Sequence, residues 1–377
     1  MSLSIRRTTA ASLLILAAGL GASAQAGAAS ASSARASQTA SPATVTATQA
    51  GAGWLGRQFK GHAFLGTKRM PSASSTAEAV LALAAAGVGG TTANAAIGWL
   101  KSNFEAYVSP GGVDDAGSLA TVILAAQAMG VDPTAFGGSQ PANNLVARLE
   151  ATQQTTGSDA GLFGSQDPTF DGAFRQGLSL MALANRGISH AVTAAGVRWL
   201  KNQQCSDGGW TSYRSATGSG NPCPAPDPDT FSGPDTNSTA LAVEGLVAAG
   251  ASFTVSPTSF FASAQNSDGG FGYIGASSQS PDPDSTGEVI QALVALGQLG
   301  NAEFTQSGGA TPVTALATFQ LGCSASKARR AAFVFPDVKG PNLLATLQAV
   351  PGEAQMAFPL TARTLSPGLP KLKCPAH

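Results

Sequence analysis

The decisive stretch of this chain reads Gln265-Asn266-Ser267-Asp268-Gly269-Gly270-Phe271-Gly272-Tyr273, and it is followed by Asp282-Pro283-Asp284-Ser285-Thr286-Gly287-Glu288-Val289. The glycine pair gives the backbone the freedom that a tight turn needs, and aspartate often bonds the amides inside such a turn. The second part holds N-cap residue types and then apolar residues at helical spacing, until Gly297 ends the pattern. One unit therefore reads helix, glycine turn, acidic loop, helix, glycine.

The same unit recurs along most of the chain. Trp99, Leu149 and Trp199 are each 50 residues apart and mark equivalent first helices. Further first helices contain Trp54-Leu55, Phe260-Phe261 and Leu316 to Gln320. The second helices are predicted at Ala77 to Gly87, Leu119 to Gly130, Gly177 to Gly187, Ala240 to Gly250, Gly287 to Gly297 and Leu343 to Gly352. A period of this length is typical of stacked helical hairpins.

The composition of the two kinds of helix predicts their positions. The second helices are apolar nearly all round, as in Thr239-Ala240-Leu241-Ala242-Val243, so they should be buried on most sides. The first helices carry Lys, Arg and Gln on one face and should lie outside. We therefore expect an all-α fold, an α6/α6 toroid of six hairpins in a closed ring over residues 51–352. An open solenoid is the alternative, and it needs polar caps at both ends.

The two ends of the chain have a different character. Residues 1–26 hold Arg6-Arg7, an apolar run and small residues before a cleavage point, which predicts a signal peptide and a secreted, extracellular protein. Residues 27–50 are rich in Ala, Ser and Thr and are predicted to be a disordered linker. Residues 353–377 form a C-terminal tail. No further apolar run is long enough for a transmembrane anchor.

Charge and cysteine content narrow the possible partners. The chain has 21 basic and 21 acidic residues, and losing residues 1–26 removes Arg6 and Arg7 but no acid, so nothing predicts nucleic acid as a partner. Four cysteines allow three pairings. We favour Cys205–Cys223, within one inter-helix loop, and Cys323–Cys374, which would tie down the tail. With no CxxC spacing and few histidines, the sequence predicts no metal site and no cofactor.

Two glycine turns resemble a known repeat. Gln203-Gln204-Cys205-Ser206-Asp207-Gly208-Gly209-Trp210 and Gln265 to Phe271 are similar to the QW repeats of squalene and terpene cyclases, over roughly residues 52–350. The repeat occurs more loosely in prenyltransferase β subunits and in transcobalamin-type carriers. The resemblance implies a ring of hairpins around an apolar cavity. It also implies a structural role for the repeat residues, namely Gln204, Asp207, Trp210, Gln265, Asp268 and Phe271.

The resemblance also raises a catalytic hypothesis. In squalene-hopene cyclases and class II diterpene cyclases, a D-x-D-D-[TS] stretch holds the aspartic acid that protonates the substrate. Asp284 falls on that position, with Asp282 and Glu288 near enough in sequence to raise its pKa. Ser285 replaces the last aspartate of the pattern, however, and aromatic residues make up only 6% of the chain. Those cyclases also place the site between two rings, and this chain is long enough for one.

Other polar residues precede the predicted inner helices. We expect them to gather at one rim of the ring, where they either cap helices or orient a ligand. In repeat register, Asn237 takes the place of Asp284. The rim candidates are Asp115, Asp171, Asp229, Asp235, Asn237, Thr239 and Thr286.

Three functions remain open on the sequence alone. The first is non-catalytic binding of an apolar or amphipathic small molecule, isoprenoid-like or corrinoid-like, in the central cavity. The second is an extracellular interaction or structural role that uses the ring surface. The third is terpene-cyclase-like catalysis with Asp284 as the general acid.

Overall fold

The computed structural model describes residues 45–167, 170–184, 190–212, 223–227, 229–230, 232–275 and 279–375. The predicted signal peptide and most of the predicted linker lie outside this range. The linker boundary needs one correction, because helix α2 begins at Ala47 and not after residue 50. The Thr46 hydroxyl accepts the Gln49 amide, and the Gln49 side chain accepts the Thr46 amide, which stabilises this helix start.

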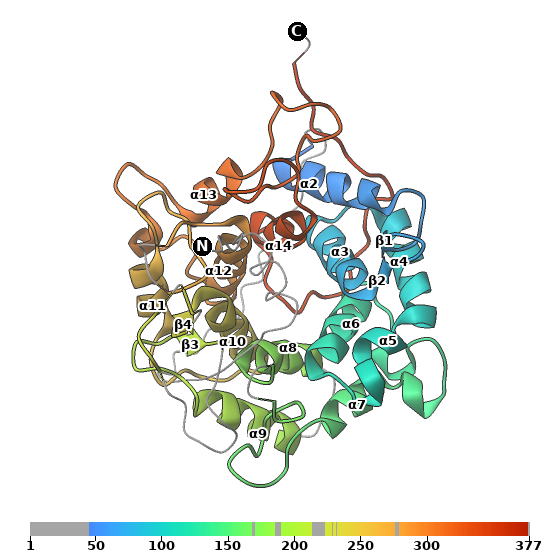
Figure 1. Cartoon of the computed structure of the whole chain (residues 1–377), viewed down its shortest axis with the longest axis vertical. Helices are drawn as coiled ribbons and strands as arrows, with labels where there is room; N and C mark the ends of the chain where they lie inside the picture. The colour runs from blue at the N-terminus through green and yellow to red at the C-terminus, as the bar shows by residue number, and fades with distance from the viewer. Residues whose placement is uncertain are drawn as a thin grey trace, which may run out of the picture.

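Six inner helices form a closed ring (Figure 1). Each of them contacts the next, and the last contacts the first, so the ring has no free ends. The all-α toroid expected from the sequence is therefore confirmed, and the open solenoid is excluded. The inner helices are α3 (Ala73–Ala86), α6 (Ala116–Ala128), α8 (Ala173–Leu183), α10 (Thr236–Ala248), α12 (Pro283–Ala295) and α14 (Leu343–Glu353).

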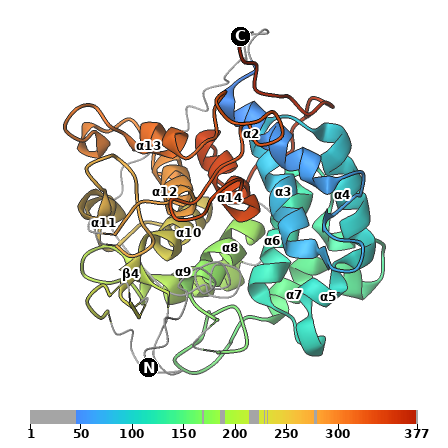
Figure 2. The same cartoon turned by 45° about the horizontal axis from the view of Figure 1, so that its top comes forward.

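A second layer of helices surrounds this ring (Figure 2). The outer helices are α2 (Ala47–Gly56), α4 (Gly90–Asn103), α7 (Leu145–Ala151), α9 (His190–Lys201), α11 (Pro257–Ala264) and α13 (Pro312–Thr318). Short elements connect the layers: α5 (Glu105–Val108), the antiparallel pairs β1 (Leu65–Gly66) with β2 (Pro71–Ser72) and β3 (Trp210–Thr211) with β4 (Pro234–Asp235), and the 3-10 turns Arg57–Phe59, Pro110–Gly112, Pro133–Ala135, Pro141–Asn143 and Ala302–Phe304.

Polar residues set the starts of the inner helices. Asp115 begins α6, Asp235 begins α10 and Asp282 begins α12, and each carboxylate accepts a backbone amide of its own first turn. Ser72 and Asn342 do the same for α3 and α14. Such caps satisfy amides that have no partner inside the helix. Asp115 and Asp235 thus perform the capping role that was one of the two alternatives for the rim candidates, and Asp282 caps α12 in the same way.

Glycines let neighbouring inner helices approach closely. A Cβ atom on Gly177 of α8 would lie 2.2 Å from the carbonyl oxygen of Leu241 on α10, and Gly245 of α10 faces the backbone of Gly177 in turn. Gly287 of α12 and Gly352 of α14 form a second such pair. The ring is consequently narrow, because two of its six contacts bring helix backbones together.

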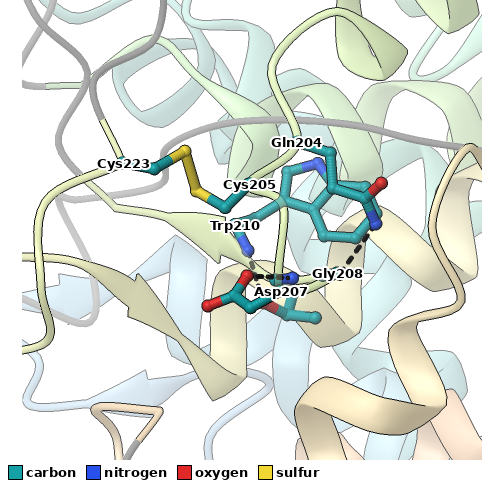
Figure 3. Close-up of a disulfide and its surroundings, with 8 residues drawn as sticks. Gln204, Cys205, Asp207, Gly208, Trp210 and Cys223 are labelled. Carbon is teal, nitrogen blue, oxygen red and sulfur yellow. Dashed lines mark hydrogen bonds between the residues drawn. A yellow bond between two sulfur atoms is a disulfide. The ribbon is translucent and has the colours of Figure 1, made fainter.

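The glutamines of the repeat brace consecutive hairpins. Gln265 donates to Gly269 O in its own turn, at 2.9 Å, and to Phe304 O just before the next outer helix, at 3.1 Å. Gln204 makes the equivalent pair of bonds, one to Gly208 O (Figure 3) and one to Val255 O. In the last copy, Gln320 donates to Ala47 O at the start of α2, so the same brace closes the ring.

The remaining repeat residues shape the turn and fill the core. Asp207 and Asp268 each accept the amide two residues further on, at 2.9 Å, as aspartates in tight turns do. Trp210 and Phe271 are fully buried. The geometry of all six residues thus supports the structural role that the resemblance implied.

The C-terminal tail returns across the ring to the first hairpins, as its red trace in Figure 1 shows. The Phe358 amide donates to Glu244 of α10, and Gly90 at the start of α4 donates to Ser366 O. The disulfides are Cys205–Cys223 and Cys323–Cys374, as predicted, and the second one fixes the end of the tail.

Candidate functional site

A cavity of about 120 Å³ lies at the centre of the ring. Every inner helix contributes to its wall, together with Tyr107 of α5 and Phe358 of the tail. Leucines and aromatic rings form the apolar part of this wall. The polar part comprises Glu78, Tyr107, Asp115, Ser118, Thr121, Arg175, Glu288, Gln291 and Gln348.

Arg175 of α8 is held by two of the predicted rim acids. Its guanidinium contacts Asp115 at 2.8 Å and Asp171 at 3.1 Å. The guanidinium carbon of Arg175 also lies over the Phe170 ring, 5.4 Å from the ring centre. The structure thus brings Asp115 and Asp171 together, and their carboxylates compensate the charge of Arg175.

Glu78 of α3 and Glu288 of α12 have no such compensation. Both line the cavity, and neither makes a hydrogen bond or ion pair within the part of the chain that the structure describes. Burial raises the pKa of Glu78 to about 7. Burial, together with repulsion from Glu78, raises the pKa of Glu288 to about 8. These acids therefore hold protons near neutral pH.

Several buried acceptor atoms next to the cavity also have no partner among the described residues. Gln291 is 1% exposed and its side-chain oxygen is unpaired, and the same holds for the oxygen of the less buried Gln348. Glu244 accepts the Phe358 amide at 2.6 Å with one oxygen, while its other oxygen has no partner. Burial, with repulsion from Glu288, raises the pKa of Glu244 well above its usual range.

Asp284 is fully buried, and neither of its carboxyl oxygens has a hydrogen-bond partner in the described chain. Burial raises its pKa well above the usual range, and the nearby carboxyls of Asp282, Glu288 and Glu78 raise it further. Asp282 differs, because it caps α12 by accepting the amides of Asp284 and Ser285. Asp284 is thus a neutral acid behind the cavity wall, and it does not itself line the cavity.

The other predicted rim residues lie elsewhere. Thr286 and Thr239 are fully buried, and their hydroxyls accept the amides of Phe271 and Trp210, so they tie each glycine turn to its inner helix. Asp235 caps α10 and accepts the Ser212 hydroxyl at 2.6 Å. These three residues are buried, and none of them lines the cavity.

Two further rim candidates also lie away from the cavity wall. Asn237 is buried at the position equivalent to Asp284 and accepts the Thr236 hydroxyl. Asp229 is exposed on a surface loop. Of the seven rim candidates, only Asp115 contributes to the cavity lining, and Asp171 reaches it indirectly through Arg175.

Sequence reasoning missed most of the polar lining. Glu78, Glu244 and Gln291 are long polar side chains within the mainly apolar inner helices. That contrast is the signal that could have identified them, because burying a polar or charged group without a partner is costly. Phe358 carried no comparable signal.

The described residues contain neither a candidate metal cluster nor a candidate membrane-spanning helix. No three His, Cys, Asp or Glu side chains there are grouped so that they could hold a metal ion. Within the same residues, no helix has both the length and the apolar character needed to cross a bilayer.

Comparison with known proteins defines the class of fold. The type II terpene cyclase MstE from Scytonema matches with a TM-score of 0.52 and 15% identity, over 82% of this chain and 96% of that one. An unsaturated glucuronyl hydrolase specific for heparin matches with a TM-score of 0.56 and 12% identity, over 82% and 95%. The chain thus has the α/α toroid fold that these proteins share.

Other comparisons add less. The ent-copalyl diphosphate synthase from Streptomyces platensis matches with a TM-score of 0.44 and 17% identity, and the aligned part spans 75% of this chain and about half, 49%, of the synthase. No protein-family model matches the sequence, and no curated protein matches it. Since the two toroid neighbours differ in the activities that their names state, the fold does not select a function.

Proposed function

We propose that this protein binds a compact amphipathic small molecule, without catalysis, in the central cavity of the ring. The observation that supports this function is the cavity itself, to which all six inner helices contribute side chains. Concave sites with apolar walls and a few convergent polar groups are the usual form of small-molecule sites. Gln291 and Gln348 also line the cavity, and each has a side-chain oxygen with no hydrogen-bond partner in the described part of the chain.

The volume of the cavity argues for a small ligand. Drug-sized ligands occupy pockets of roughly 300 Å³ or more, and an engineered cavity of about 150 Å³ accommodates benzene. A cavity of about 120 Å³ is therefore suited to one small ring or a short branched chain. A whole polyprenyl chain or a corrinoid exceeds this volume.

Filling the cavity is expected to abolish binding. We predict that protein purified from its own source retains a small molecule, detectable by native mass spectrometry, and that a Leu178→Trp variant does not retain it. Leu178 lines the cavity from α8, so the larger ring occupies the ligand's space. Met70→Trp is the matched control, because Met70 is 78% exposed on the outer surface. Equal retention by both variants would place the ligand outside the ring.

We also propose that the protein acts outside the cell. Its two disulfides support this location, since structural disulfides persist mainly in oxidising compartments. An interaction role for the ring surface has less support. The large apolar side chains exposed on the described surface, Met70, Val113 and Val338, are single residues far apart in sequence.

Acid catalysis by Asp284 is the second candidate. The specific observation in its favour is a buried, partnerless carboxyl group with a strongly raised pKa, as an acid that donates a proton requires. If this candidate is right, Asp284→Asn abolishes turnover of an isoprenoid substrate while the Asp229→Asn variant retains it. Undiminished product formation by Asp284→Asn would remove the candidate.

A further inference from the structure

We propose that the ligand of the central cavity is a protonated amine on a compact apolar body. This inference rests on the proposed binding function and names the chemical class of its ligand. It depends on three features of the cavity: an excess of carboxyl groups, unpaired acceptor atoms and aromatic rings in the wall.

The balance of charge around the cavity favours a cation. Arg175 is the one cationic side chain among the described residues of the wall, and Asp115 and Asp171 already pair with it. Glu78 and Glu288 line the same cavity, and no hydrogen bond or ion pair joins either of them to another described residue. A cationic ligand would supply the missing charge, whereas an anionic ligand would meet two further carboxyl groups.

The unpaired polar atoms point to a ligand that donates hydrogen bonds. Gln291 and Gln348 line the cavity, and each has a buried side-chain oxygen with no hydrogen-bond partner among the described residues. Leaving a buried acceptor unsatisfied is unfavourable. An ammonium group has three donors and no acceptor, so it suits a wall that consists mainly of acceptors.

The apolar part of the wall is also suited to a protonated amine on a compact apolar body. Phe174, Tyr107 and Phe358 present aromatic rings to the cavity, and aromatic faces attract ammonium groups. Leu81, Leu124 and Leu241 surround the remaining space. A neutral alcohol would satisfy the acceptors and the leucines, but it would not compensate the carboxyl groups.

Binding of an ammonium ion should release protons. In the free protein, burial raises the pKa of Glu78 to about 7 and that of Glu288 to about 8, so both acids are partly protonated near neutral pH. A bound cation stabilises their ionised forms, so their protons leave on binding and affinity rises with pH until the free carboxyls are themselves ionised. The other titratable or charged groups around these two acids are Tyr107 from α5, Asp115 before α6, Arg175 from α8, Glu244 from α10, and Asp284 from α12.

Three probes that share one ring separate charge from shape. The full chain, freed of any retained ligand, is titrated calorimetrically with cyclohexylamine, cyclohexanol and cyclohexanecarboxylate. We expect cyclohexylammonium to bind at least about tenfold more tightly than cyclohexanol at about pH 8, and the carboxylate not to bind. Its affinity should fall by about tenfold at about pH 6, and titrations in two buffers of different ionisation enthalpy should show proton release near neutral pH.

Variants link the effect to the cavity. Glu288→Gln keeps the size of the side chain and should lower the affinity for cyclohexylammonium about tenfold, while the affinity for cyclohexanol stays the same. Glu303→Gln, on an exposed turn, should change neither. Equal or tighter binding of cyclohexanol, or ammonium binding without proton release, would overturn the inference and leave the binding function standing. Binding of none of the probes would contradict both.

Discussion

Replacing Asp284 by Asn raises the free energy of unfolding at about pH 8 and changes it little at about pH 4. The reason is proton linkage. In the folded protein, burial and three neighbouring carboxyls keep Asp284 protonated far above its usual range. In the unfolded chain the same group loses its proton above about pH 4. The folded state thus binds more protons, and stability falls as pH rises.

The size of this effect follows from the same linkage. Each pH unit between the two pKa values lowers stability by about 1.4 kcal/mol for one group, and asparagine removes this dependence. Asparagine also fits the position, since Asn237 is buried at the equivalent place in the preceding repeat. Denaturant unfolding at both pH values measures the difference. Asp229→Asn, on the surface, is the control and should change stability little at either pH.

A pH-independent difference between the Asp284→Asn variant and the parent would show that Asp284 is compensated in solution. If the difference grows with pH as expected, the protein retains a costly buried acid that a neutral residue could replace. Such a cost is typical of functional sites, where stability is exchanged for activity or binding.

The second large effect is expected from Gly177→Ala, which should lower the free energy of unfolding by about 3 kcal/mol. The new methyl group would lie 2.2 Å from the carbonyl oxygen of Leu241, and this neighbour is backbone that cannot rotate away. Helices α8 and α10 would have to separate. Because Leu178 and Leu241 line the cavity from these two helices, the variant should also weaken ligand retention.

The matched control is Gly98→Ala in the outer helix α4. Gly98 is exposed, and nothing lies within 4 Å of the added methyl group. Replacing glycine by alanine inside a helix raises the free energy of unfolding by about 0.5 to 1 kcal/mol. Thermal and denaturant unfolding should therefore both show a lower stability for Gly177→Ala and a higher stability for Gly98→Ala. A Gly177→Ala protein as stable as Gly98→Ala would mean that the inner helices are not in close backbone contact.

The ring could be predicted from the sequence because its cause is local and repeated. The 50-residue spacing of Trp99, Leu149 and Trp199 reports one hairpin per interval, and apolar second helices can only be inner ones. The cysteine pairing was predictable for a similar reason, since Cys205 and Cys223 share one loop.

The cavity wall could not be predicted in the same way. When a helix is apolar on all sides, its sequence does not reveal which side faces the axis, and ring geometry decides that Glu78 and Gln348 do so. The narrow bore arises from the pairing of Gly177 with Gly245, two residues from different repeats. The bonds of Thr239 and Thr286 to the glycine turns could not be predicted either, because a hydroxyl near a helix start is equally consistent with ligand binding at a rim and with bracing a turn.

The brace from Gln320 to Ala47 and the contact of α14 with α3 have a consequence for biosynthesis. The partners of the first hairpin belong to the sixth hairpin, so they are synthesised long after it. Until the sixth hairpin is made, the apolar face of α3 that packs against α14 stays exposed. Contacts between segments so far apart in sequence also form slowly. Nascent copies should therefore depend on holding factors until the final hairpin arrives.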